Sequence, residues 1–95
     1  MDDADSWRHV RPFSNIVSFI EADGRLTLRH SESCECFSYS PEDAVMWIVL
    51  QRHEWRLDES AQALSQMWAK DLLWTRVKLS RWLDELTYAG LIEEI

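Results

Sequence analysis

The sequence predicts an α+β fold of winged-helix type, in which a three-stranded antiparallel meander precedes three helices. Two apolar segments flanking Asp23-Gly24 indicate a hairpin, and Pro and Gly residues mark helix ends later in the chain. The chain is 46% hydrophobic and includes only 2 Gly and 2 Pro, a composition typical of a globular protein. Its 95 residues are too few for two domains. We therefore expect a single domain over residues 15–95, preceded by a loose N-terminal arm over residues 1–14 that lacks apolar periodicity.

The first two strands are predicted on either side of the Asp23-Gly24 turn. Residues 15–21 are rich in Ile, Val and Phe, and residues 25–29 alternate polar with apolar side chains. The alternation places Leu26 and Leu28 on the side that faces the core. Because Gly accepts positive φ, Asp23-Gly24 fits a two-residue type I′ turn.

Residues 34–39 read as the third strand. The alternation puts Glu35, Phe37 and Tyr39 on one face and both cysteines, Cys34 and Cys36, on the other. Two positions apart on a strand, the cysteines lack good geometry for a disulfide, so we expect reduced thiols. With His30 they also resemble part of a zinc site, but a fourth ligand of matching spacing is lacking, which favours ordinary packing.

Three helices follow, near residues 41–52, 58–69 and 73–89. The first begins at Ser40-Pro41-Glu42-Asp43, because Ser caps free N–H groups, Pro suits the first helical position, and carboxylates favour the positive end of the helix dipole. It is apolar nearly all round, as expected of a buried central helix. Gly90 is placed to end the third helix, after which Leu91–Ile95 forms a short strand or tail.

Six tryptophans are many for a chain of this length. Trp47, Trp68 and Trp82 fall on apolar helical faces and are predicted in the core. The other three are candidates for partner contact, because Trp is favoured at binding hot spots; they are Trp7, Trp55 and Trp74.

Charge and composition exclude several classes of function. A formal charge of −7 opposes broad binding to nucleic acid, which depends on Lys and Arg at phosphates. The longest apolar run, residues 44–50, is too short to span a bilayer, and the acidic start is unlike a secretory signal, so we expect a cytoplasmic protein without membrane contact. No catalytic triad order or Gly-rich phosphate loop is present, so neither an enzyme nor a cofactor is expected.

From Ser40 onward the chain resembles the PqqD-like proteins, also called RiPP recognition elements. Ser40, Ala44 and Trp47 match the opening of that family's first helix, and Ala61 and Leu64 match its second. The phrase Leu-x-x-x-Gly-Leu-Ile over residues 86–92 matches the end of its third. The similarity covers residues 15–92 and departs in the bulky linker over residues 52–56 and in the number of tryptophans.

The resemblance implies a protein that does no chemistry itself. Such proteins bind the leader segment of a ribosomally made precursor peptide as an added strand and present it to a peptide-modifying enzyme. The leader lies along the third strand of the sheet, in a groove walled by the third helix. Carried onto this chain, the leader-binding residues would be Glu35, Cys36, Phe37, Ser38 and Tyr39 on the strand, and Arg76, Lys78, Arg81 and Trp82 on the helix.

Other interpretations remain open at this point. Phe37 and Tyr39 could simply pack into the core, and the three cations could form a solvated face supported by Asp84 and Glu85. A winged helix could also be a nucleic-acid-binding or regulatory adaptor with its third helix in the major groove. The carboxylates on that helix oppose phosphate binding, which favours the leader-binding hypothesis.

Overall fold

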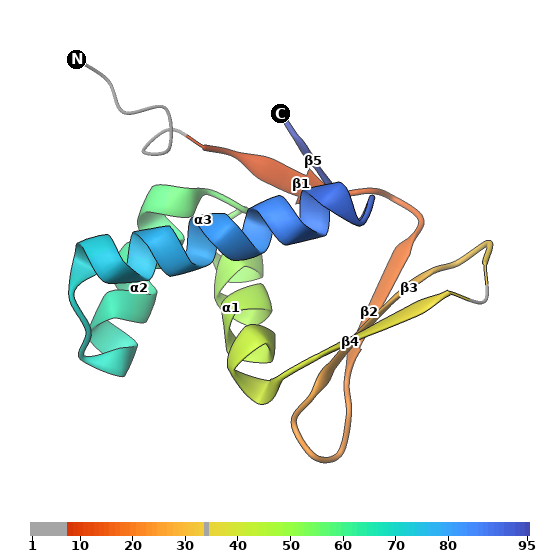
Figure 1. Ribbon diagram of the computed structural model, residues 1–95, viewed down its shortest axis with the longest axis horizontal. Helices are drawn as coiled ribbons and strands as arrows, with labels where there is room; N and C mark the ends of the chain where they lie inside the picture. The colour runs from red at the N-terminus through yellow and green to blue at the C-terminus, as the bar shows by residue number, and fades with distance from the viewer. Residues whose placement is uncertain (1–7, 34) are drawn as a thin grey trace.

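The computed structural model describes residues 8–33 and 35–95. The elements in chain order are β1 (Val10–Pro12), β2 (Ile16–Ile20), β3 (Leu26–His30), β4 (Cys36–Tyr39), α1 (Pro41–Arg52), α2 (Leu57–Trp68), α3 (Leu72–Tyr88) and β5 (Ile92–Glu94). The helices gather at one end of the molecule and the β2-β3-β4 meander extends from the other (Figure 1). The predicted α+β architecture, a three-stranded meander followed by three helices, is confirmed.

The meander is antiparallel throughout, with the order β2-β3-β4. Leu28 of β3 pairs with Ser18 of β2 and with Phe37 of β4, which fixes the register of the whole sheet. Leu26 and Leu28 are fully buried, as their alternation predicted. Since β4 lies at one end of the order, it is an edge strand among the described residues.

The β2–β3 turn differs from the predicted two-residue type I′ turn. Gly24 N–H donates to Glu21 O at 2.9 Å, and Glu21 N–H donates to Arg25 O at 2.7 Å, so the loop is one residue longer than predicted. Gly24 has a φ of +90°, whereas Asp23 is not among the residues with positive φ. A β-turn followed by a glycine in the left-handed region gives a three-residue hairpin loop, which needs Gly at one position only.

Helix α1 begins as its sequence predicted. Ser40 Oγ accepts a hydrogen bond from Asp43 N–H at 3.1 Å, and Pro41 stands at the first helical position. Ala44, Met46 and Trp47 are buried on this helix, which makes it the central element of the core. Helices α2 and α3 each begin and end one position earlier than predicted, within the usual uncertainty of helix ends.

The end of α3 depends on Gly90. Its φ is +79°, and Leu91 N–H donates to Leu86 O at 2.9 Å, which is the six-to-one bond of a Schellman ending. The chain then reverses into β5, where Ile92 is buried. Leu91 and Ile92 thus join the core immediately after the helix stops.

The N-terminal segment corrects the prediction of a loose arm over residues 1–14. Residues 10–12 form β1, which pairs antiparallel with β5, and Val10 is completely buried. Arg8 contacts Asp84 and Glu94 through its guanidinium. The folded unit therefore begins by residue 8 and not at residue 15. The remainder of the predicted arm, residues 1–7, lies outside the described residues.

Candidate functional site

The open edge of β4 is the first component of the site. Which main-chain groups of β4 face outward can be worked out from the hydrogen bonds at the two ends of the β2–β3 pair. Glu21 N–H donates to Arg25 O, and Ser31 N–H donates to Asn15 O, each at 2.7 Å. Because hydrogen-bonded and non-hydrogen-bonded pairs alternate in antiparallel sheets, the odd-numbered residues of β3 bond to β2 and the even-numbered residues bond to β4.

The register between β3 and β4 gives the β4 partners of these even-numbered residues. Leu26 stands opposite Tyr39, and Leu28 stands opposite Phe37. Phe37 and Tyr39 therefore direct their N–H and C=O groups inward to β3. The main-chain groups that face the open edge belong to the intervening residues, Cys36 and Ser38.

The side chains of β4 alternate between half-buried and exposed. Phe37 and Tyr39 are half-buried and pack against the core, so these two aromatic rings contribute to the sheet's inner face. Glu35, Cys36 and Ser38 are exposed. Tyr39 meets Trp82 of α3 edge to face, with ring centroids 5.8 Å apart, and this contact joins the edge strand to the third helix.

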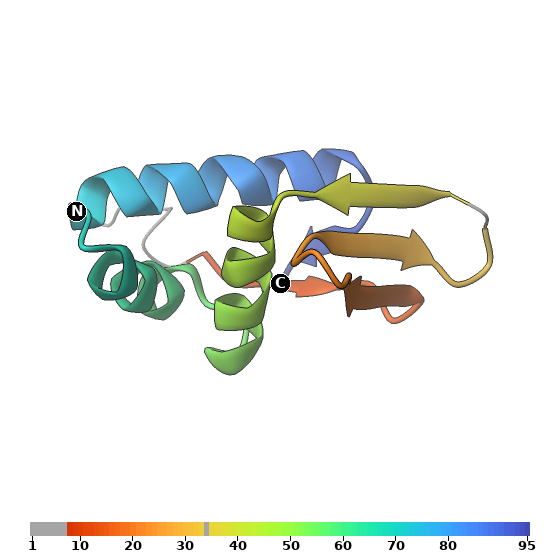
Figure 2. The same ribbon diagram turned by 90° about the horizontal axis from the view of Figure 1, so that it is seen from below.

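A groove of about 670 Å³ lies between α1 and α3, and one of its lining residues, Trp82, contacts Tyr39 at the end of β4. Asp43 and Met46 contribute from α1, and the α3 side is formed by Trp74, Val77, Lys78, Arg81, Trp82 and Glu85. Figure 2 shows the C-terminal part of α3 next to the end of β4 that leads into α1, with the rest of the helix extending beyond that end of the strand. The volume lies in the ordinary range for ligand sites.

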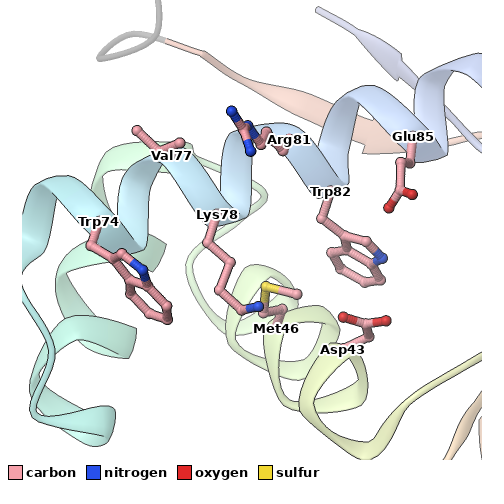
Figure 3. A pocket seen from close by; sticks show the side chains of 8 residues that line it. All are labelled: Asp43, Met46, Trp74, Val77, Lys78, Arg81, Trp82 and Glu85. Atoms are coloured by element: carbon pink, nitrogen blue, oxygen red, sulfur yellow. The ribbon is translucent and has the colours of Figure 1, made fainter.

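Figure 3 shows how the lining residues are arranged. Trp74, Lys78, Trp82 and Glu85 project from α3 toward α1, whereas Arg81 lies on the outer rim. Lys78 Nζ lies 5.6 Å from the centroid of the Trp74 ring and 2.8 Å from Glu42 Oε1. The end of the groove far from β4 therefore holds an aromatic ring in a cation–π contact with a lysine that is also paired with Glu42.

The structure separates the predicted helix residues into two groups. Lys78, Arg81 and Trp82 line the groove between α1 and α3. Arg76 does not line it: its guanidinium faces Asp58 of α2, 3.8 Å from Nη2 to Oδ1. Residues 76 and 78 are two positions apart, about 200° around a helix, so they point to different neighbours.

Several lining residues were absent from the sequence-based set. Asp43, Met46, Val77 and Glu85 belong to the groove, and Trp74 was proposed only as a general partner contact. The α3 members recur every three or four residues from position 74 to 85, so helical periodicity could have identified that face. The α1 members could not be found in this way, because their position depends on how α1 packs under α3.

The three tryptophans predicted in the core lie there, and Trp55, predicted to contact a partner, packs against the core instead. Trp47 and Trp82 are buried and Trp68 is half-buried against the core. Trp74 is exposed at 46%, in keeping with a role in partner contact. Trp55 packs edge to face on Trp47 with ring centroids 4.7 Å apart, so it belongs to the core boundary, and Trp7 lies outside the described residues.

Burial and two carboxylates change the pKa of Tyr39. Burial raises the pKa of this phenol, and the negative charges of Glu85 and Asp43 raise it further. The end of the groove nearest β4 therefore carries two negative charges, whereas Lys78 toward the far end is paired with Glu42.

The described residues contain no group of three side chains suited to a metal ion. The zinc site considered from the sequence, His30 with Cys34 and Cys36, includes Cys34, which lies outside the described residues. In the same part of the chain, no helix is both long and apolar enough to cross a membrane.

No family model and no curated protein matches the sequence. Among solved structures, the chain is similar to the one described as "TbiB1 in Complex with the TbiA(beta) Leader Peptide". The TM-score is 0.76 at 20% sequence identity, and the match covers 87% of this chain and 94% of that chain. The two chains share a fold. That fold agrees with the resemblance found from the sequence.

Proposed function

We propose that this protein binds the leader segment of a ribosomally synthesised precursor peptide by adding it as a strand to β4. The observation that carries the proposal is the open β4 edge, which the Tyr39–Trp82 contact joins to the groove between α1 and α3. The structural similarity to TbiB1, solved with a leader peptide, supports the same function. The protein would then present the peptide to a modifying enzyme, do no chemistry itself and act in the cytoplasm.

The edge of β4 offers the main-chain contacts for such a strand. Cys36 and Ser38 each direct an N–H and a C=O outward, at the spacing that an extended peptide matches. Their side chains are exposed. Main-chain pairing supplies affinity for any extended segment, and specificity must come from side-chain pockets.

The groove supplies those pockets. A peptide that pairs with β4 and continues past Tyr39 reaches Trp82 first and then Lys78 and Trp74. Aromatic rings pack against apolar side chains, and Lys78 and Arg81 attract acidic residues of a leader. We infer a protein partner and not nucleic acid, because α3 also carries Asp71, Asp84 and Glu85 in a chain of net charge −7.

A proline at Ser38 tests strand addition. It removes an outward N–H without breaking a bond to β3, and a sheet edge is where proline is tolerated. The control is Ser38→Ala, which removes the hydroxyl and its 3.4 Å contact with Arg25 Nε but keeps the N–H. We expect Ser38→Pro to abolish binding of a precursor leader encoded beside the gene for this chain, and Ser38→Ala to leave binding within about twofold.

Isotope-labelled protein titrated with that leader, and separately with a DNA duplex, reports the location of binding. Shifts confined to β4, α3 and the start of α1 with the leader, and none with DNA at about 0.15 M salt, support the proposal. Saturable DNA binding without a response to the leader contradicts it, as does leader binding that survives Ser38→Pro.

A further inference from the structure

The β4 end of the groove holds two carboxylates from opposite walls. Asp43 lies in the first turn of α1, and Glu85 lies in the last part of α3. Figure 3 shows both pointing into the space beside Trp82, on the side away from Lys78. Within residues 8–33 and 35–95, neither makes an ion pair, whereas Glu42 on the same turn as Asp43 is paired with Lys78.

A second, independent feature points to a ligand in the same place. Trp82 is 4% exposed, and its buried indole N–H has no hydrogen-bond partner in the part of the chain that the structure describes. Figure 3 shows the indole nitrogen facing the space between the two carboxylates. A buried donor without an acceptor is costly, and a ligand carbonyl at this position would satisfy it.

The charges of Asp43 and Glu85 act on a neighbouring side chain, Tyr39. The pKa of the neighbouring Tyr39 phenol is raised by burial and by Glu85 and Asp43, so both carboxylates act on the same small volume. Tyr39 and Trp82 form the aromatic side of that volume, with their rings edge to face.

We propose that Asp43, Glu85 and Trp82 form an anchor site for one arginine of the bound peptide. This inference rests on the proposed function, and it names a basic residue where the cations of α3 alone would suggest a uniformly acidic leader. The guanidinium lies between the carboxylates of Asp43 and Glu85, and a main-chain carbonyl of the peptide accepts from the Trp82 indole. Because Tyr39 is the last residue of β4, the arginine stands next to the segment that pairs with the edge.

Arginine suits the site better than lysine. Its planar guanidinium presents five donors, enough for two carboxylates at once, and it stacks on aromatic rings such as those of Tyr39 and Trp82. A lysine ammonium is more strongly hydrated and offers a single point charge. Arginine is therefore expected to be preferred over lysine, and either over a neutral side chain.

The probe is a display library of random linear peptides, selected on the full-length chain and then counter-screened on Ser38→Pro to retain those that use β4. We expect the retained peptides to share one arginine. The strongest binder is then synthesised with that arginine replaced by citrulline, which keeps the shape and removes the charge. The citrulline peptide should bind at least about tenfold more weakly, as charge-assisted hydrogen bonds imply.

Variants of the protein locate the effect. In Asp43→Asn combined with Glu85→Gln, the difference between the two peptides should fall to within about twofold, while the citrulline peptide binds as it does to the original protein. Glu59→Gln removes an exposed carboxylate from α2, outside the groove, and should leave the difference unchanged.

The possible outcomes distinguish a failure of the arginine anchor from a failure of leader binding at β4. Peptides that require β4 but tolerate citrulline overturn the arginine anchor and leave leader binding intact. A citrulline effect that persists in the Asp43 and Glu85 variant also overturns the anchor. A selection that yields no peptide dependent on β4 overturns both proposals.

Discussion

Arg8 offers a direct test of the finding that the folded unit includes the N-terminal segment. Its side chain is 10% exposed, and its guanidinium lies 2.8 Å from Asp84 Oδ1 and 2.6 Å from Glu94 Oε1. It also donates to Ser80, to the carbonyl oxygen at 3.0 Å and to Oγ at 2.9 Å. One side chain thus joins the residues before β1 to α3 and β5. Replacing Arg8 with Met keeps the apolar stem and removes all four contacts.

The expected cost follows from the exposure of each partner. Hydrogen bonds to charged groups contribute about 1.5 to 3 kcal/mol each when both partners are buried. Asp84 and Glu94 are 70% and 49% exposed, so water replaces much of what they lose, and the desolvation of Arg8 is relieved in the variant. We therefore expect Arg8→Met to destabilise the fold by about 1 to 3 kcal/mol in total.

Urea unfolding followed by tryptophan fluorescence measures this change. At an m-value of about 1 to 3 kcal/mol/M, the midpoint should fall by on the order of 1 M. The matched control is Arg11→Met on β1, which removes one ion pair, to Glu93, from an arginine that is 61% exposed. That variant should cost under about 1 kcal/mol, and more of its effect should disappear at high salt. Equal midpoints for the two variants would refute the reasoning, because Arg8 would then be a surface side chain.

Three further outcomes are expected. Trp47→Ala should destabilise the fold by about 3 to 5 kcal/mol, because the ring is 3% exposed at the centre of the core; a loss below about 1 kcal/mol in urea unfolding would place it at the surface. Gly90→Ala should cost about 1 to 2 kcal/mol from the φ of +79° alone, because an added Cβ meets no atom within 4 Å, and an unchanged midpoint would contradict this. Because the folded-state pKa of Tyr39 is raised above 10, its contribution to stability is present below pH 10 and is lost as pH rises through the folded pKa. Tyr39→Phe should flatten that alkaline decline in thermal melts, and an identical decline in both proteins would show that another group is responsible.

Much of the fold was accessible from the sequence because its signals are local. The cap at Ser40, the alternation of Leu26 and Leu28 and the glycine at position 90 act within a few residues, and each has the predicted effect. The β1–β5 pair was not accessible. The two strands lie at opposite ends of the chain, and strands of three residues are too short to show alternation. Their antiparallel pairing is therefore visible only in the folded structure.

The candidate site divides in the same way. The edge strand and the groove face of α3 were predicted in part, because β4 and α3 each show a regular pattern. Arg76 was grouped with Lys78 and Arg81 on charge alone, and the packing of α2 against α3 separates it by turning it toward Asp58. Asp43 entered the site only because α1 lies beneath α3, and no residue near it in sequence signals that position.

By itself the sequence determined the order of strands and helices, the helix ends and the buried positions of the central elements, since these depend on hydrophobic periodicity, caps and backbone preferences of neighbouring residues. Only the tertiary structure decided which charges share a groove, which main-chain groups of β4 face outward and where the N-terminal segment docks. These features arise from contacts between segments distant in the chain, where small rotations of one helix against another choose among partners of similar local chemistry.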